Sequence, residues 1–137
     1  MKTGRLNIFL VTFVVAILCL GCDRSEDEAR QRLGKGMWLQ SVGEFRRAKR
    51  EFEVITSEYP DTKAAKDALR MLDQIPEVMV RRAQELKDQS KIPSAERLCG
   101  QIIDKYPGTK NAQAAQELID QMKEGYNRVA YEHLRKA

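Results

Sequence analysis

Tyr59-Pro60-Asp61-Thr62-Lys63 decides the fold, because a near-copy returns 47 residues later as Tyr106-Pro107-Gly108-Thr109-Lys110. In each copy the proline disfavours helix at the tyrosine before it, and the threonine that follows can cap a new helix. The stretch therefore marks a corner between two helices. Aligning residues 45–90 with 92–137 gives 15 identities in 46 positions without a gap, which predicts a duplicated helical repeat.

Apolar residues recur at steps of three and four on both sides of each corner, which is typical of helices with one buried face. The spacing predicts five helices, over about 26–41, 45–59, 62–89, 92–106 and 109–134. The expected stripe of the last helix is Ala112, Ala115, Ile119, Met122, Tyr126 and Ala130. The third contains Pro76, yet its apolar stripe keeps the same phase across the proline, which favours one kinked helix. Two helices broken at Pro76 are the alternative.

These helices form a half repeat (26–43) followed by two full repeats (44–90 and 91–137). A single repeat cannot bury its apolar stripe, so the repeats are expected to stack as antiparallel helices. Ser25 and Glu28 have the spacing of a capping box, which predicts that the first helix begins directly after Ser25.

Residues 1–21 have the pattern of a secretion signal, with two positive charges before an apolar run over 6–20. As a helix this run would span about 22 Å, less than the roughly 30 Å hydrocarbon core of a bilayer. It ends in Leu18-Cys19-Leu20-Gly21-Cys22, which resembles the lipobox of bacterial lipoproteins, with a cysteine where leucine is usual. The resemblance implies acylation of Cys22, for example with palmitate, and a short tether over 22–25. Ordinary signal-peptidase cleavage or an uncleaved signal anchor are the alternatives.

The composition offers little for catalysis. His133 is the one histidine, and Cys99 is the cysteine left once the signal is removed and Cys22 is acylated. Cys99 falls on an apolar stripe, which favours a buried, unreactive thiol. The net charge is +4, and two of the positive charges belong to the signal, so the remainder gives no argument for nucleic acid. We therefore expect no enzyme activity, metal, cofactor or nucleic-acid partner.

The residues around the corners resemble tetratricopeptide repeats. That family's characteristic positions hold Gly36, Leu39, Gly43, Ala48 and Phe52 in the first motif and Ala83, Leu86, Ala95 and Cys99 in the second. The resemblance implies an all-α fold: a short right-handed stack of antiparallel helix pairs over residues 26–137. A HEAT-like stack of helix pairs is also compatible with the 47-residue spacing. The segment 51–69 resembles repeats of the lipoproteins that assist β-barrel assembly in the outer membrane and of the Tol-Pal coordinator.

The same resemblance implies a groove that binds an envelope protein or a peptide segment of one. Its lining is expected to be Leu33, Met37, Gln40, Val80, Gln84, Lys87 and Tyr131, with Asn127 and Leu134 beside Tyr131. We expect an extended or helical peptide to place an apolar anchor near Leu33 and Met37. The alternative is that both side chains are buried against the second helix. Trp38 is either a packing ridge or an exposed anchor.

A basic run on the second helix suggests a different contact. Four cations fall on its solvent side: Arg46, Arg47, Lys49 and Arg50. Close to a membrane they could bind anionic headgroups. A plain solvated face is the alternative.

Together these features predict a protein anchored by lipid to the inner or outer membrane of a bacterial envelope, on the periplasmic side. The expected role is a protein–protein scaffold in outer-membrane protein assembly. A pilotin-like accessory of secretion or pili, and a membrane-surface binder using the basic helix, are the alternatives. The sequence pattern carries no signal for an oligomeric state.

Overall fold

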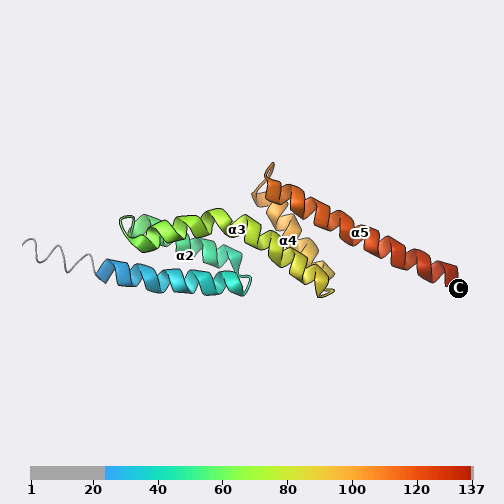
Figure 1. Cartoon of the computed structure of the whole chain (residues 1–137), viewed down its shortest axis with the longest axis horizontal. Helices are drawn as coiled ribbons and strands as arrows, with labels where there is room; N and C mark the ends of the chain where they lie inside the picture. Colours follow the sequence, from blue (N-terminus) through green and yellow to red (C-terminus); the bar gives the residue numbers. More distant parts are fainter. Residues whose placement is uncertain (1–23, 137) are drawn as a thin grey trace, which may run out of the picture. The chain divides into compact units, whose positions relative to one another are not determined.

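The computed structural model of the chain describes the backbone of residues 24–136 and the side chains of residues 24–126. The described residues form helices and no strands. An N-terminal helix over 24–41 is followed by α2 (Phe45–Glu58), α3 (Lys63–Asp88), α4 (Ile92–Lys105) and α5 (Lys110–Lys136) (Figure 1). The predicted all-α class is confirmed. The predicted signal, Cys22 and the first residues of the tether lie outside the described residues.

Each Tyr-Pro corner ends one helix and caps the next, as predicted. In the first corner, Thr62 Oγ1 accepts a hydrogen bond from the N–H of Ala65 at 3.1 Å and donates to the carbonyl of Tyr59 at 2.7 Å. Thr109 makes the equivalent two bonds in the second corner, at 3.2 and 2.7 Å. The threonine hydroxyl thereby satisfies one of the backbone donors that a helix leaves unpaired at its start.

α3 is a single helix that contains Pro76, so the prediction of one helix is confirmed and the two-helix alternative is wrong. The chain nevertheless divides within α3 into two compact units, Met1–Leu72 and Asp73–Ala137. Leu72 lies four residues before Pro76, where a helical carbonyl loses its hydrogen bond because proline has no N–H. Unit 1 therefore holds the N-terminal helix, α2 and the start of α3, while unit 2 holds the rest of α3 with α4 and α5.

The core of unit 1 is built around Phe52, whose side chain is fully buried. Gly36 of the N-terminal helix faces it so closely that an added Cβ would lie 2.4 Å from Phe52 Cε1. A glycine at this position therefore makes room for the ring. The other buried apolar residues of the described part of unit 1 are Ala29, Leu39, Phe45, Ala48, Ile55, Ala64, Ala65 and Ala68.

The core of unit 2 has Cys99 at the position equivalent to Phe52. Cys99 is fully buried, so the predicted buried thiol is confirmed, and Ala83, which stands where unit 1 has Gly36, is buried too. Tyr126 was expected to continue the buried stripe of α5, but its side chain is 55% exposed. The stripe prediction is wrong there because none of the described residues forms a helix over it. The remaining buried apolar residues are Ile75, Met79, Ala95, Ile102, Ala112, Ala115, Leu118 and Met122.

The start of the N-terminal helix differs from the prediction. Arg24 is already helical, so the helix does not begin directly after Ser25 but includes it. Two carboxylates of this first turn bind the first corner. Glu26 Oε2 accepts the N–H of Lys63 at 2.9 Å, and Glu28 Oε2 accepts the hydroxyl of Tyr59 at 3.2 Å. These acids therefore join the N-terminal helix to the corner between α2 and α3.

Candidate functional site

Large apolar side chains are exposed at the end of the N-terminal helix. Trp38 is 63% exposed, Met37 49% and Val42 48%, whereas Leu33, one turn earlier, is half-buried. The alternative that Met37 is buried against α2 is wrong, and Trp38 is exposed. These four residues are called the Trp38 surface below, and three of them, Met37, Trp38 and Val42, lie outside the core of unit 1. Large apolar side chains that stay exposed in one short segment are typical of contact surfaces.

The other predicted groove residues divide between the two units. Gln40 of unit 1 is half-buried, as are Val80, Gln84 and Lys87 of unit 2. Gln84 Nε2 donates to Asp88 at 2.7 Å, and Lys87 Nζ donates to Gln121 Oε1 at 2.6 Å. The side chains of Tyr131, Asn127 and Leu134 lie outside the described residues. The described groove residues are thus at least partly accessible, and Gln84 and Lys87 are hydrogen-bonded within unit 2.

Unit 2 contains a pocket that the sequence interpretation found only in part. Its volume is about 400 Å³, and its lining is Lys87, Ile92, Gln121, Met122, Gly125 and Tyr126. Of these, only Lys87 was predicted as a binding residue. The pocket was otherwise missed because Met122 and Tyr126 were assigned to the core stripe. Gly125 was the one available signal: glycine weakens a helix, so a glycine inside one suggests that space is needed beside it.

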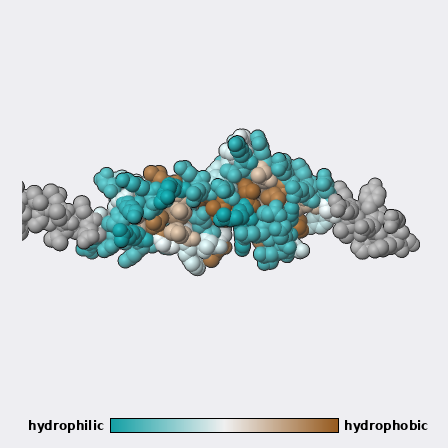
Figure 2. Space-filling view, in the orientation of Figure 1, coloured by the Kyte–Doolittle hydropathy of each residue, from teal (hydrophilic) through white to brown (hydrophobic). Residues whose placement is uncertain are grey.

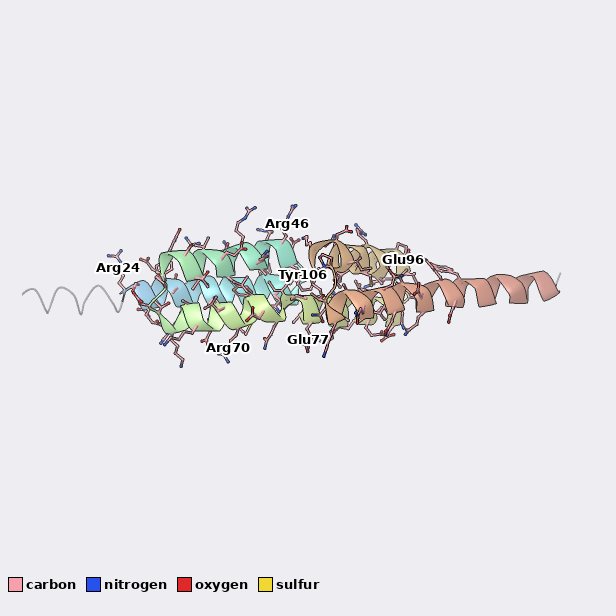
Figure 3. All side chains as sticks on the ribbon, turned by 90° about the horizontal axis from the view of Figure 1, so that it is seen from above. Arg24, Arg46, Arg70, Glu77, Glu96 and Tyr106 are labelled. Atoms are coloured by element: carbon pink, nitrogen blue, oxygen red, sulfur yellow. The ribbon has the colours of Figure 1, made fainter. Side chains whose placement is uncertain are left out.

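The basic run of α2 is exposed along its whole length, as Figure 3 illustrates for Arg46. Lys49 forms an ion pair with Glu53 at 3.5 Å. Across residues 24–126, Arg46, Arg47 and Arg50 pair with no carboxylate. Their charges are therefore available to an outside anion.

Glu51 follows the basic run directly, but its carboxylate pairs with cations of another helix. Its carboxylate lies 2.6 Å from Lys35 Nζ and 3.3 Å from Arg32 Nη1, both on the N-terminal helix. The hydrogen bond from Lys35 is the main cause that lowers the pKa of Glu51, with a further contribution from Arg32. This carboxylate holds α2 on the N-terminal helix, so it does not neutralise the basic run. The sequence pattern did not reveal this cluster.

Neither the thiol nor the acidic groups point to catalysis. Burial raises the pKa of the Cys99 thiol, which keeps it protonated and unreactive. Among the described residues, no group of three or more histidine, cysteine, aspartate or glutamate side chains could hold a metal ion. Over the same part of the chain, no helix combines the length and the apolar character needed to cross a membrane.

The face seen in Figure 2 is mostly hydrophilic, with apolar areas on both units. No protein-family model, curated protein or solved structure matches the chain. The resemblance to tetratricopeptide lipoproteins therefore stays a prediction from the sequence.

Proposed function

We propose that the chain is a lipid-anchored protein of the bacterial envelope whose helical repeats bind another protein during outer-membrane protein assembly. The anchor is Cys22, which follows a signal-like apolar run and a small residue. The repeats supply the helical support, and the exposed side chains of the N-terminal helix supply the contact. A pilotin-like role in secretion or pili uses the same parts and differs only in the partner.

The Trp38 surface is the observation that carries this proposal. Trp38 and Met37, which are about half exposed or more, keep apolar surface in contact with water, and burying that surface in a partner would be favourable. Tryptophan is among the residues that contribute most to protein–protein binding. Methionine adapts its shape to different partners. The surface therefore has the composition of a protein contact.

Acylation is tested by labelling with palmitate in bacteria that express the full chain. The label is expected to enter the wild-type chain and to be lost from Cys22→Ala. Equal labelling of both, or of neither, contradicts the lipid anchor.

The partner is tested by placing a photo-crosslinking amino acid at Met37 or Trp38 of the full chain in intact envelopes. The exposed Ser57 of α2 is the matched control position. Crosslinks to a component of barrel assembly are expected at 37 and 38 but not at 57. A product with a pilus or secretion component supports the pilotin-like alternative. Products of equal yield from all three positions contradict a specific surface.

A second candidate function is binding to a membrane surface, and the unpaired arginines of α2 favour it. Arg46, Arg47 and Arg50 are exposed and lack carboxylate partners among the described residues, and each could contribute up to about 1 kcal/mol near anionic lipid. Trp38 and Val42 come just before them in the chain and are suited to the headgroup region.

This candidate is tested with Cys22→Ala, which removes the acyl anchor, and vesicles with and without anionic lipid. Replacing Arg46, Arg47 and Arg50 by glutamine should weaken binding to anionic vesicles. The control replaces Arg24, Arg70 and Lys66, which keeps the net charge of the two variants equal. Unchanged binding of the α2 variant, or equal loss in the control, rejects a specific membrane-binding face.

A further inference from the structure

One face of α5 repeats a buried face of α3 but is only partly covered. The 47-residue offset pairs Ile75 with Met122 and Met79 with Tyr126. Ile75 and Met122 are buried, at 1% and 4% exposed, so the two faces begin alike. One turn further, Met79 is 1% exposed whereas Tyr126 is 55% exposed. The stripe thus leaves the core between Met122 and Tyr126.

The difference follows from which helix covers each face. Residues 89–91 join α3 to α4, and this short connection turns the chain so that α4 runs back along the end of α3 (Figure 1). Met79 and Ala83 of α3 are buried in unit 2, as are Ala95 and Cys99 of α4. For α5, none of the described residues provides a helix in the place that α4 takes beside α3.

The pocket lies on this uncovered face. Ile92, Met122 and Tyr126 form its apolar lining, and the Lys87–Gln121 hydrogen bond lies at its edge. A Cβ added to Gly125 would meet no atom within 4 Å, whereas a Cβ added to Gly36 would collide with Phe52. Packing within the chain therefore explains why residue 36 is a glycine, but it does not explain Gly125. Glycine is the weakest helix former after proline, so Gly125 weakens α5 without a packing reason inside the chain. The missing side chain leaves room for a group from outside.

We propose that this face of α5 binds one amphipathic helix of a partner protein, and that a bulky apolar side chain of that helix enters the pocket beside Gly125. The occupant is a helix because the equivalent face of α3 is covered by one. The expected partner helix resembles α4 and not α2. The 47-residue offset pairs Ala130 of α5 with Ala83, and the unit of Ala83 has the small Cys99. A helix like α2 would bring a phenylalanine, and Phe52 requires a glycine opposite it.

This inference rests on the proposed role in protein binding, but it assigns a different surface from the Trp38 surface. The expected partner is a helix with apolar residues at steps of three and four, as α4 has at Ile92, Ala95, Cys99 and Ile102. Its binding requires neither acylation nor a place in barrel assembly. Loss of crosslinks from Met37 would thus contradict the proposed function and leave the α5 face untouched.

The test uses the full chain in a mild non-ionic detergent and a fluorescent peptide with the sequence of residues 90–107, kept reduced. Fluorescence anisotropy measures its binding. Gly125→Leu fills the pocket, and leucine is a better helix former than glycine, so this variant should keep the helix content of the wild type. Gly100→Leu is the matched control, because Gly100 is also helical and an added Cβ there meets no atom within 4 Å.

We expect saturable binding that Gly125→Leu weakens at least tenfold and that Gly100→Leu changes less than twofold. A scrambled peptide of the same composition should not bind, and the peptide 44–60, which carries Phe52, should bind more weakly than 90–107. The proposal is overturned if 90–107 does not bind saturably, if Gly125→Leu binds it as wild type does, or if 44–60 binds equally well. Sedimentation provides a further check: a wild-type dimer that Gly125→Leu dissociates would make a second copy the occupant and overturn the partner helix.

Discussion

In unit 1 the N-terminal helix and α2 are held together by an aromatic ring and a charge cluster. Phe52 occupies the space left by Gly36, and Glu51 binds Lys35 and Arg32 across the two helices. The ring fixes the distance between the helices, since any larger residue at 36 would collide with it. The charge cluster adds contacts of defined geometry at the edge of the same interface.

Unit 2 has equivalent helices and an equivalent corner, but different side chains at the positions of the ring, the glycine and the charge cluster. The equivalents of Phe52 and Gly36 are Cys99 and Ala83, and the equivalents of Glu51 and Arg32 are Leu98 and Met79. In unit 2 a thiol replaces the ring, and the facing residue carries a methyl group. Of the charge cluster only the cation equivalent to Lys35 is kept, as Arg82, which pairs with Glu85 of its own helix. The comparison shows that the corners and the helix period preserve the fold while the packing between helices changes.

The largest difference should follow from truncating the two central side chains. Phe52→Ala is expected to destabilise the chain by about 3–5 kcal/mol, because it leaves a ring-sized cavity. Cys99→Ala removes one sulfur atom and should cost only about 1 kcal/mol. Urea unfolding followed by circular dichroism measures both. Losses of similar size would contradict the different roles of these residues.

The fit between Phe52 and Gly36 is tested by filling the glycine. Gly36→Ala should destabilise by about 1–3 kcal/mol, because its Cβ would overlap the ring. Gly34→Ala is the control in the same helix, where an added Cβ meets no atom within 4 Å. It should stabilise by up to about 1 kcal/mol through helix propensity alone.

A double variant sharpens this result. Combining Gly36→Ala with Phe52→Cys gives unit 1 the pair found in unit 2. We expect the double variant to be more stable than the sum of the two single effects predicts, because the smaller side chain removes the overlap. Strictly additive free energies of unfolding would mean that the two residues do not act as a pair.

The two corners should respond alike, because their geometry is the same. Thr62→Ala and Thr109→Ala each remove a hydroxyl that caps the next helix, at an expected cost of about 1 kcal/mol. Thr62 is also buried, so its loss should be the slightly larger one. Thermal unfolding measures both, with serine at each position as the conservative control that keeps the cap. A clear loss in the serine variants would show that the methyl group, not the hydroxyl, matters.

The smallest effect concerns the charge cluster and depends on pH. Since the pKa of Glu51 is lower in the folded chain than its ordinary value of 4.5, its contribution is complete above that value. The contribution disappears as pH falls through the lower folded pKa. Glu51→Gln should therefore cost about 0.5–1 kcal/mol at pH 7, and the difference from wild type should shrink towards pH 3. Leu98→Gln in unit 2 is the control, whose effect should not change with pH in this way.

The helices themselves could be predicted because their signals are local. The proline and threonine of each corner act within a few residues, and the phase of the apolar stripe identified α3 as one helix across Pro76. Burial of Cys99 followed from the same stripe. Local steric and hydrogen-bonding rules were sufficient for each of these features.

The contacts between helices were not predictable in the same way. A stripe shows which face of a helix is apolar, but not how far along the helix a neighbour covers it. Tyr126 continues the stripe and is exposed, and no pattern around Glu51 indicated that its carboxylate binds two cations of another helix. Ser25 had the spacing of a cap, yet the helix already includes Arg24.

By itself, the sequence determined the all-α class, the two corners and the identity of the buried side chains near them, because these depend on interactions within a few residues. Only the tertiary structure decided that Trp38 and Tyr126 are exposed, that Gly125 borders a pocket and that Gly36 makes room for Phe52. Those facts depend on which residues distant in the chain come together. Burial at each of these positions depends on the length and placement of the neighbouring helix. A periodic pattern along one helix does not show either of them.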